Sequence, residues 1–403
     1  MCPGTKNKIN LSADPAAFWC LFIYRAAYYA ALKKLKSCCI SCPGTRCETI
    51  LQMMAVAKIF LRCRSQKESS LLMYRVGIDL GGTNIKAGIT DKNNAILAQA
   101  NIPTDLRKSE YEIIGEMSEL AKRLVRESGV SREKIDGIGV GSPGVIDSAA
   151  GIVKYSNNFG WENVPLAALL SSFTSAPVFV ANDAECAALG EAAAGAGRRC
   201  GNLILLTLGT GIGGGIIVDG KLFRGKCGGG VVGHTVIVKG GRQCTCGRRG
   251  CLETYASASA LIRETNRVIQ EKPDSLLAVK YGRAGLPVTG KTAFDAAAAG
   301  DVDAKKIVGD YIEYLGEGIA NLINVFRPEK FLISGGVCNQ GDSLFDPLNV
   351  FVRKNCFAAD KLYIPLIERA MLGNSAGIIG AALLVPENEG RPCARAGAER
   401  KGG

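Results

Sequence analysis

The sequence predicts an α/β fold made of two similar halves, and two hairpins with glycine-rich tips are the observations that predict it. The first hairpin is expected at residues 75–90, with a Gly-Gly-Thr-Asn tip at 81–84. The second is expected at 203–218, with a Gly-Thr-Gly tip at 209–211. Aliphatic and β-branched residues flank both tips, as in buried strands, and helical patterns follow each hairpin. A hairpin-then-helix unit that occurs twice indicates a duplicated α/β fold around a cleft.

The segments outside the hairpins alternate between strand and helix patterns. A helix is expected at 110–127, because Ile113, Met117, Leu120 and Leu124 recur at near-helical spacing. Further strands are expected at 135–141, 177–181 and 330–334, and further helices at 183–194, 254–270, 304–326 and 375–384. Two polar residues, Asn182 and Asp183, follow directly at the carboxyl end of the strand at 177–181.

Charge and composition separate a basic extension from a nearly neutral body. Residues 1–72 hold 11 Lys/Arg against 3 Asp/Glu, an excess of 8 in a chain whose net charge is +12. Because the body is close to neutral, we expect no nucleic-acid partner. The composition changes at Met73, which we interpret as the natural start; the extension is then an upstream read-through or a poorly ordered appendage. The expected organisation is an extension at 1–72, an N-terminal α/β domain at 73–190 completed by the C-terminal helix at 375–385, a larger α/β domain at 191–374 with a cysteine-bearing loop, and a tail at 386–403.

The extension carries no clear targeting or metal signal. Its apolar run at 16–32 is interrupted by Arg25, lacks a small-residue cleavage site and is short for a membrane span, although an interfacial amphipathic helix stays open. It holds 7 of the 16 cysteines, but Cys39 and Cys42 have no second pair at zinc-ribbon spacing, so chance explains them better. We therefore expect no membrane partner, and thiolates in the body favour a cytoplasmic, reducing compartment.

The only histidine of the chain stands close to three cysteines. His234, Cys244, Cys246 and Cys251 form an H-x9-C-x-C-x4-C pattern. One imidazole and three thiolates suit a closed tetrahedral zinc site, which would fix a loop too rich in glycine to hold its own shape. The alternative is a set of free thiols beside a solvated histidine. We predict structural zinc, because four protein ligands leave no open position for chemistry.

Glycine-rich turns follow three of the expected strands, at 81–83, 209–211 and 335–336. Such turns bring backbone N–H groups close to phosphate oxygens, whereas a single glycine turn only marks a tight hairpin. Three of them favour a nucleoside triphosphate as ligand. Asp79, which has no partner evident in the sequence, could hold Mg2+ through water or simply cap its strand.

With these motifs, the chain from about residue 74 to residue 384 resembles the ROK family of sugar kinases and repressors, and it is similar to bacterial ROK glucokinases. The matching motifs are DLGGTNIKAGI at 79–89 and LGTGIGGG at 208–215 for the phosphate loops, SPG at 142–144 and NNFGW at 157–161 for the sugar-side loops, ND at 182–183 for the catalytic pair, and CxCGxxGCLExYAS at 244–257 for the zinc signature. The resemblance implies an actin-like, ribonuclease-H-like duplicated fold whose two domains close on ATP and a sugar.

The resemblance also implies ATP-dependent phosphorylation of glucose at its 6-hydroxyl, with Asp183 as the general base. A carboxylate at a strand end beside a phosphate loop can accept the hydroxyl proton, while Mg2+ and backbone amides absorb charge on the transferred group. The implied sugar-binding residues are Asn158, Asn182, His234, Glu253 and Gly144. The implied ATP- and phosphate-binding residues are Asp79, Gly81, Gly82, Thr83, Asn84, Lys86, Gly209, Thr210, Gly211, Gly335 and Gly336. The implied cofactors are Mg2+ with ATP and structural Zn2+, and the implied assembly is a homodimer or homotetramer.

The chain departs from the family pattern at one sugar-side position. The family has a GExGH motif whose Glu accepts hydrogen bonds from sugar hydroxyls, whereas this chain has Val231 three residues before His234. A missing charged acceptor costs about 1.5–3 kcal/mol of binding free energy. The substrate is therefore open between glucose and another hexose such as fructose, mannose or N-acetylmannosamine.

A sugar-responsive transcription repressor is an alternative from another class. The extension at 1–72 has the length and basic charge of a winged-helix domain, but it lacks a helix-turn-helix pattern, and the aromatic run at 18–29 suits a recognition helix badly. Retention of Asp183 and both phosphate loops favours the kinase.

Overall fold

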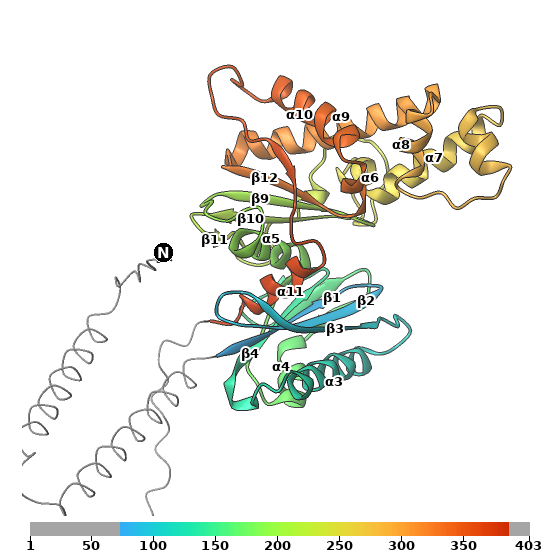
Figure 1. Cartoon of the computed structure of the whole chain (residues 1–403). Helices are drawn as coiled ribbons and strands as arrows, with labels where there is room; N and C mark the ends of the chain where they lie inside the picture. The colour runs from blue at the N-terminus through green and yellow to red at the C-terminus, as the bar shows by residue number, and fades with distance from the viewer. Residues whose placement is uncertain (1–72, 387–403) are drawn as a thin grey trace, which may run out of the picture. The chain divides into compact units, whose positions relative to one another are not determined.

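The computed structural model describes residues 73–386, which Figure 1 shows in colour and which belong to one compact unit. The expectations for the extension at 1–72, including Cys39 and Cys42, and for 387–403 of the tail lie outside the described residues. The described chain forms two five-stranded mixed sheets and one three-stranded antiparallel sheet. Within residues 73–386, no helix has both the length and the apolar content needed to span a membrane.

The first sheet begins with the predicted hairpin. Its strands are β1 (Tyr74–Leu80), β2 (Asn84–Thr90), β3 (Ile96–Pro103), β4 (Ile135–Ser142) and β8 (Val178–Asn182), in the spatial order β3-β2-β1-β4-β8. The strands β1, β2 and β3 pair antiparallel, whereas β4 and β8 run parallel to β1. Helices α3 (Glu110–Ser128) and α4 (Leu166–Thr174) contribute to the core on one side of this sheet, where Ile78, Met117 and Leu170 are fully buried.

Local signals fix the ends of helix α3, which the sequence placed at 110–127. The side chains of Ser109 and Glu112 form a reciprocal capping box, and the Ser109 N–H donates to Glu112 Oε2 at 2.9 Å. Gly129 ends the helix in the left-handed region, with φ 69°. The predicted helix is therefore confirmed. Its caps and its apolar spacing indicate the same bounds.

The second sheet repeats the arrangement of the first. Its strands are β9 (Leu203–Leu208), β10 (Ile212–Val218), β11 (Lys221–Leu222), β12 (Lys330–Ser334) and β13 (Ile367–Arg369), in the spatial order β11-β10-β9-β12-β13. Strands β9, β10 and β11 pair antiparallel, and β12 and β13 run parallel to β9. Both sheets thus have the same strand order relative to their own chain order, which confirms the predicted duplication.

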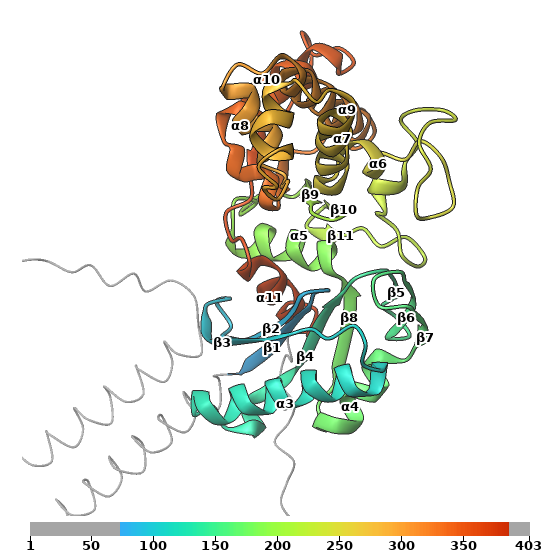
Figure 2. The ribbon, with the colours of Figure 1, turned by 90° about the vertical axis from the view of Figure 1, so that its right-hand side faces the viewer.

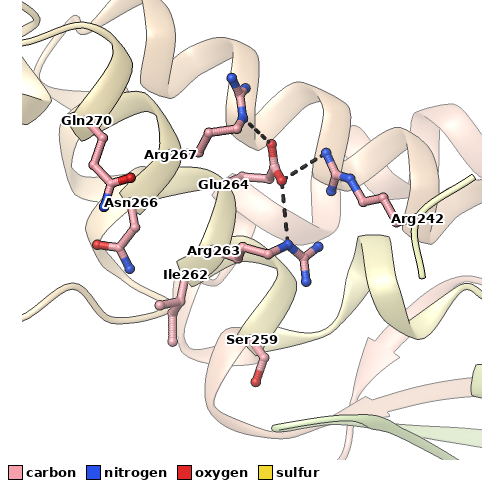
Figure 3. Close-up of a pocket in the computed structure, with 8 residues that line it drawn as sticks. All are labelled: Arg242, Ser259, Ile262, Arg263, Glu264, Asn266, Arg267 and Gln270. Carbon is pink, nitrogen blue, oxygen red and sulfur yellow. Dashed lines mark hydrogen bonds and ion pairs between the residues drawn. The ribbon is translucent and has the colours of Figure 1, made fainter. Parts of the chain in front are cut away.

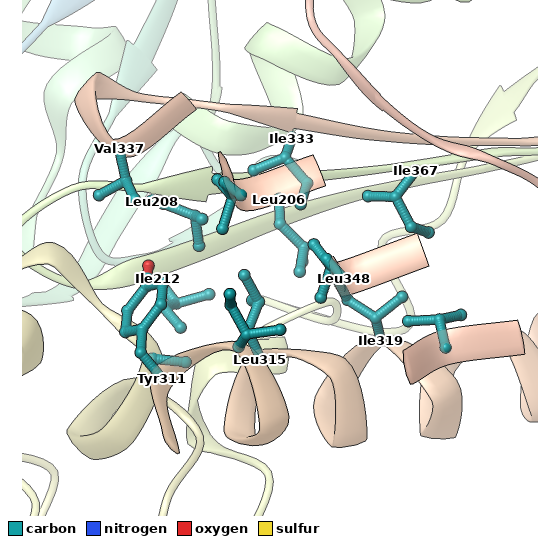
Figure 4. Packing of buried hydrophobic residues seen from close by; sticks show 14 of the residues in the cluster. Leu206, Leu208, Ile212, Tyr311, Leu315, Ile319, Ile333, Val337, Leu348 and Ile367 are labelled. Atoms are coloured by element: carbon teal, nitrogen blue, oxygen red, sulfur yellow. The ribbon is translucent and has the colours of Figure 1, made fainter. Parts of the chain in front are cut away.

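The largest apolar core lies between the second sheet and helix α9 (Val302–Phe326). Figure 4 shows Leu206 and Leu208 of β9 facing Leu315 and Ile319 of α9 across this core. Each fully buried side chain of this size contributes about 1.5–3 kcal/mol relative to exposure. Helix α10 (Asp342–Asn355) closes the core with Leu348.

Several elements were not predicted. They are the three-stranded sheet of β5 (Val145–Asp147), β6 (Ile152–Ser156) and β7 (Trp161–Val164), the strands β3, β11 and β13, and the helices α4, α8 (Thr292–Ala298) and α10. The helix expected at 254–270 is two helices, α6 (Glu253–Ala256) and α7 (Ala258–Glu271). The single-helix prediction was wrong because Ser257 has extended backbone and caps α7, its Oγ accepting from the Ala260 N–H at 3.0 Å.

Two helices are exchanged between the sheets. Helix α5 (Asp183–Ala194) leaves the first sheet directly after β8 and packs on β9 and β10 of the second. Helix α11 (Ser375–Ala382) comes after β13 of the second sheet and packs on β1 and β4 of the first. Figures 1 and 2 show both helices between the two sheets, in contact with each other.

Glycines allow backbone to meet backbone where these helices cross. A methyl group on Gly380 of α11 would lie 1.6 Å from the carbonyl oxygen of Cys186 in α5. A methyl group on Gly139 of β4 would lie 1.7 Å from the carbonyl oxygen of Ala381 in α11. Both distances are far shorter than any non-bonded contact, so the position of α5 and of its first residue, Asp183, requires glycine at these points.

Gly380→Ala is expected to destabilise the fold strongly, because the added methyl group meets backbone atoms that cannot move on their own. Overpacking of this kind costs at least about 1–3 kcal/mol, measurable by urea unfolding followed by circular dichroism. The control is Gly309→Ala in α9, where an added methyl group meets nothing within 4 Å. That variant should gain about 0.5–1 kcal/mol from helix propensity, and equal stability of the two variants would contradict the close crossing.

Candidate active site and metal centre

Asp183 lies where strand β8 ends and helix α5 begins. The preceding residue, Asn182, caps the helix: its Oδ1 accepts from the Ala184 N–H at 2.9 Å, and its own N–H donates to Glu185 Oε2 at 3.2 Å. Asn182 Nδ2 also donates to the carbonyl oxygen of Gly144 at 3.0 Å. The predicted catalytic and sugar-side residues Asp183, Asn182 and Gly144 are therefore held together by a capped helix start.

Burial and a neighbouring negative charge make Asp183 a weaker acid than usual. Burial raises the pKa of the Asp183 carboxyl, and the charge of Asp79 adds to the shift, to about 6. The Ala184 N–H, 3.0 Å from Asp183 Oδ1, opposes the shift. Burial also raises the pKa of Asp79, against the lowering effect of Lys86. Two carboxylates with raised pKa values in one place are typical of a site that handles protons or cations.

Asp79 has a partner that the sequence did not reveal. It pairs in register with Lys86 across the β1–β2 hairpin, and Lys86 Nζ lies 3.7 Å from Asp79 Oδ2. Lys86 Nζ also donates to Asn374 Oδ1 at 3.0 Å, just before helix α11. Asn374 was missed because 288 residues separate it from Lys86, and no local pattern marks that contact.

The predicted phosphate turns are compact and partly open. In the first turn, the Gly81 N–H donates to the Asn84 carbonyl at 3.1 Å, and the Thr104 hydroxyl donates to the Gly81 carbonyl at 2.7 Å. Gly82 has open space where a side chain would be, and Thr83 is exposed.

The second and third turns lie next to each other. The Gly209 N–H donates to the Gly211 carbonyl at 3.0 Å, and Thr210 is exposed at the tip. Gly335 has φ 108°, and a methyl group there would lie 2.1 Å from the Leu208 carbonyl oxygen. Gly336 has open space on its side-chain face.

Two predicted sugar-side residues come from other segments, Glu253 from the start of helix α6 and Asn158 from a turn. Glu253 Oε2 accepts from the Ile212 N–H at 2.8 Å, so this carboxylate sits against the second glycine turn. Asn158 is exposed in the turn between β6 and β7. Val231 is half exposed and begins a short 3-10 turn (Val232–His234), so a longer side chain has room there.

The four predicted metal ligands converge. Within residues 73–386 the ligand atoms of His234, Cys244, Cys246 and Cys251 all lie within 4.8 Å of one another. His234 Nδ1 is 3.6 Å from Cys244 Sγ, and Cys246 Sγ is 3.7 Å from Cys251 Sγ. In a zinc tetrahedron with bonds of about 2.3 Å, two sulfurs lie about 3.8 Å apart, so the cluster fits zinc.

The loop is shaped to present these thiols. Gly250 has φ 84°, and a methyl group there would lie 1.7 Å from the Val238 carbonyl oxygen, so only glycine fits. Burial, together with the neighbouring Cys246 and Cys244 thiols, raises the pKa of the Cys251 thiol to about 12. A cation is therefore needed to hold Cys251 as a thiolate at neutral pH, and zinc supplies that charge when bound.

Comparison with known proteins identifies the family. The ROK family model matches residues 75–388. The chain belongs to the ROK family. A glucokinase of Halalkalibacterium halodurans is 41% identical over 323 residues, which cover 78% of this chain and 96% of the relative. The crystal structure of a ROK family glucokinase from Streptomyces griseus in complex with glucose and AMPPNP has a TM-score of 0.67 and 32% identity, covering 78% of this chain and 99% of that chain. A xylose repressor of Caldicellulosiruptor bescii is 30% identical over 311 residues, which cover 77% of each chain.

Membership of the ROK family confirms the actin-like α/β fold with two mixed sheets. The sequence analysis did not predict a role for Glu185, whose side chain completes the capping box at the start of α5. The pattern Asn182-x-x-Glu185 is typical of a capping box and could have indicated it.

The ROK protein is expected to contain one zinc ion per chain, measurable by elemental analysis. Cys251→Ser should lose the ion and lower the thermal midpoint, because the remaining ligands cannot complete the tetrahedron and the loss of a structural zinc costs on the order of several kcal/mol. Cys227→Ser changes an exposed cysteine outside the cluster and should keep both zinc and stability. Full zinc occupancy in Cys251→Ser would contradict the assignment.

Proposed function

We propose that this ROK protein transfers the γ-phosphoryl group of ATP to the 6-hydroxyl of glucose, which gives glucose 6-phosphate. The observation that carries the proposal is the Asp183 carboxyl, which stands at a capped helix start beside Asn182 and near the charge of Asp79. The similarity to glucokinases of H. halodurans and S. griseus supports glucose as the sugar and ATP as the donor.

Asp183 would act as general base. Its carboxylate accepts the proton of the sugar 6-hydroxyl while that oxygen attacks the γ-phosphorus, and the bond to the β-phosphate oxygen breaks with ADP as the leaving group. A pKa of about 6 keeps Asp183 mostly ionised above neutral pH yet close enough to accept a proton efficiently.

The other residues would hold the two substrates. The backbone N–H groups of the glycine turns at 81–84 and 209–211 would take phosphate oxygens, with Lys86 adding a positive charge. Asp79 would hold Mg2+, which neutralises phosphate charge when bound, through water. Asn158, Asn182 and Glu253, with the ring nitrogen of His234 that faces away from the thiols, would contact sugar hydroxyls.

Val231 favours a second candidate, a kinase for another hexose. A half-exposed valine cannot accept a hydrogen bond from a sugar hydroxyl where the family has Glu. Discrimination between hexoses rests on such single hydroxyl contacts, so a sugar that lacks or inverts that hydroxyl loses less in this site.

Turnover of ATP with a panel of hexoses tests the function on the full-length chain. Glucose-dependent ADP release is expected, and Asp183→Asn should reduce kcat by about 100- to 10,000-fold, because the amide cannot take a proton. Asp360→Ala, at an exposed position, is the control. Full activity of Asp183→Asn would overturn its role as the base, and no turnover with any hexose would overturn the proposed kinase activity.

The pH profile of the wild type is a separate test. Its kcat/KM should fall about tenfold per pH unit below about pH 6, since protonated Asp183 is inactive.

Val231→Glu is expected to lower the apparent KM for glucose at least several-fold, because it restores a charged acceptor worth about 1.5–3 kcal/mol. Parallel glucose titrations at saturating ATP measure the change. Val236→Glu places the same charge on another exposed valine, in the loop at 234–251 that carries the four metal ligands (the zinc loop), and should leave KM unchanged. An unchanged KM in Val231→Glu would show that the sugar lies elsewhere.

A further inference from the structure

An open groove of about 680 Å³ runs along helix α7, and none of the predicted sugar or phosphate residues lines it. Three arginines, Arg242, Arg263 and Arg267, gather around the single carboxylate of Glu264 in this groove, as Figure 3 shows. Arg242 comes from the zinc loop, and the other two come from α7. The groove therefore lies between the zinc loop and helix α7, at a point with three cations and one carboxylate.

Glu264 does not balance the positive charge around it. Arg242 Nη2 lies 2.8 Å from Glu264 Oε1, Arg267 Nε lies 3.1 Å from Oε2, and Arg263 Nε is at 3.8 Å. Glu271 takes a second contact from Arg267, so three guanidinium groups face two carboxylates. Partial burial and the charge of Arg242 lower the pKa of Arg263, whereas the hydrogen bond to Glu264 and the charge of Glu271 raise the pKa of Arg267. The uncompensated positive charge therefore lies on the side of Arg242 and Arg263.

Two of the three guanidinium groups are also held by contacts other than Glu264. Arg242 stacks on the ring of Tyr255 at 4.9 Å, and Tyr255 packs on Tyr314 with ring centroids 4.6 Å apart. Arg263 Nη2 donates to the Thr254 carbonyl. Each guanidinium has five N–H donors, so several remain for a planar or tetrahedral oxyanion.

Neutral hydrogen-bonding side chains continue the groove beside the arginines. Ser259, Asn266 and Gln270 line it along α7, next to the aliphatic Ile262. A hydroxyl and two amides can both donate to and accept from hydroxyl groups of a ligand. The lining thus combines a site for a phosphate dianion with a surface for several hydroxyls.

We propose that this groove binds a sugar phosphate, with the phosphate on Arg242, Arg263 and Arg267 and the sugar hydroxyls on Ser259, Asn266 and Gln270. The choice of a sugar phosphate rests on the proposed function, which produces one.

The groove connects physically to the candidate active site. The Arg242 N–H donates to the Tyr255 hydroxyl at 2.7 Å, and Tyr255 follows Glu253 by two residues in the same short helix. Glu253 in turn accepts from Ile212 at the second glycine turn. A ligand that pulls Arg242 towards its phosphate thus acts on the zinc loop and on α6, and glucose and the sugar phosphate should affect each other's binding.

Equilibrium dialysis with labelled glucose 6-phosphate, on the full-length zinc-loaded protein at low salt, counts the bound equivalents. The double variant Arg263→Ala/Arg267→Ala should bind one equivalent fewer than the wild type. Arg283→Ala, whose guanidinium pairs with the exposed Asp274, should match the wild type. Equal stoichiometry in the double variant and the wild type overturns the groove site. If the proposed function fails instead, the wild type binds one equivalent and the double variant binds none.

Two further experiments test whether the sugar contributes to binding and exclude misfolding as the cause of lost binding. Inorganic phosphate should occupy the groove at least tenfold more weakly than glucose 6-phosphate; equal affinity would overturn the sugar part of the proposal. Asn266→Asp is nearly isosteric, so it should keep the thermal midpoint while its negative charge weakens glucose 6-phosphate binding at least tenfold. Unchanged affinity in this variant would contradict the placement of the ligand.

Discussion

The backbone contact between helices α5 and α11 positions the start of α5, with Asp183, and the start of α11, beside Asn374. Gly380 meets the Cys186 carbonyl at a distance that excludes any side chain, and glycines of β10 meet α5 in the same way. A methyl group on Gly215 would lie 2.3 Å from Ala188 Cβ. Because each helix begins in one half and packs on the other, the two sheets and the start of α5 are fixed relative to one another. Part of the glycine-rich second motif therefore serves packing.

The raised pKa values of the two carboxyl groups follow from that placement. The start of α5 puts Asp183 near Asp79, and burial makes both carboxylates unfavourable as anions. Lys86 compensates only the charge of Asp79. Lys86 also donates a hydrogen bond of 3.0 Å to Asn374, which directly precedes α11. A bound cation or phosphate-linked Mg2+ would relieve the remaining charge. The same logic applies to the zinc loop, where buried thiols need a cation to be thiolates.

The sequence was sufficient where the signal is local. The two hairpins, helix α3 and the four zinc ligands each lie within a short window, and the structure forms all of them. It was insufficient where partners are distant and for most short elements, and it also missed the longer β3 and α10. Asn374 contacts Lys86 across 288 residues, and strands of three to five residues such as β5 and β6 are too short to show alternation. The break at Ser257 was overlooked because the apolar spacing continues through it, although its capping serine was readable.

The most direct test of the central claim is whether the two glycine hairpins serve a single nucleotide. Hydrogen–deuterium exchange of the full-length protein can be compared with and without Mg2+ and a non-hydrolysable ATP analogue. The duplicated fold predicts slower exchange at both 81–84 and 209–211, together with the first turn of α5. Protection at only one hairpin, or at neither, would contradict a shared site and would leave the repeated hairpins as a structural feature of the fold.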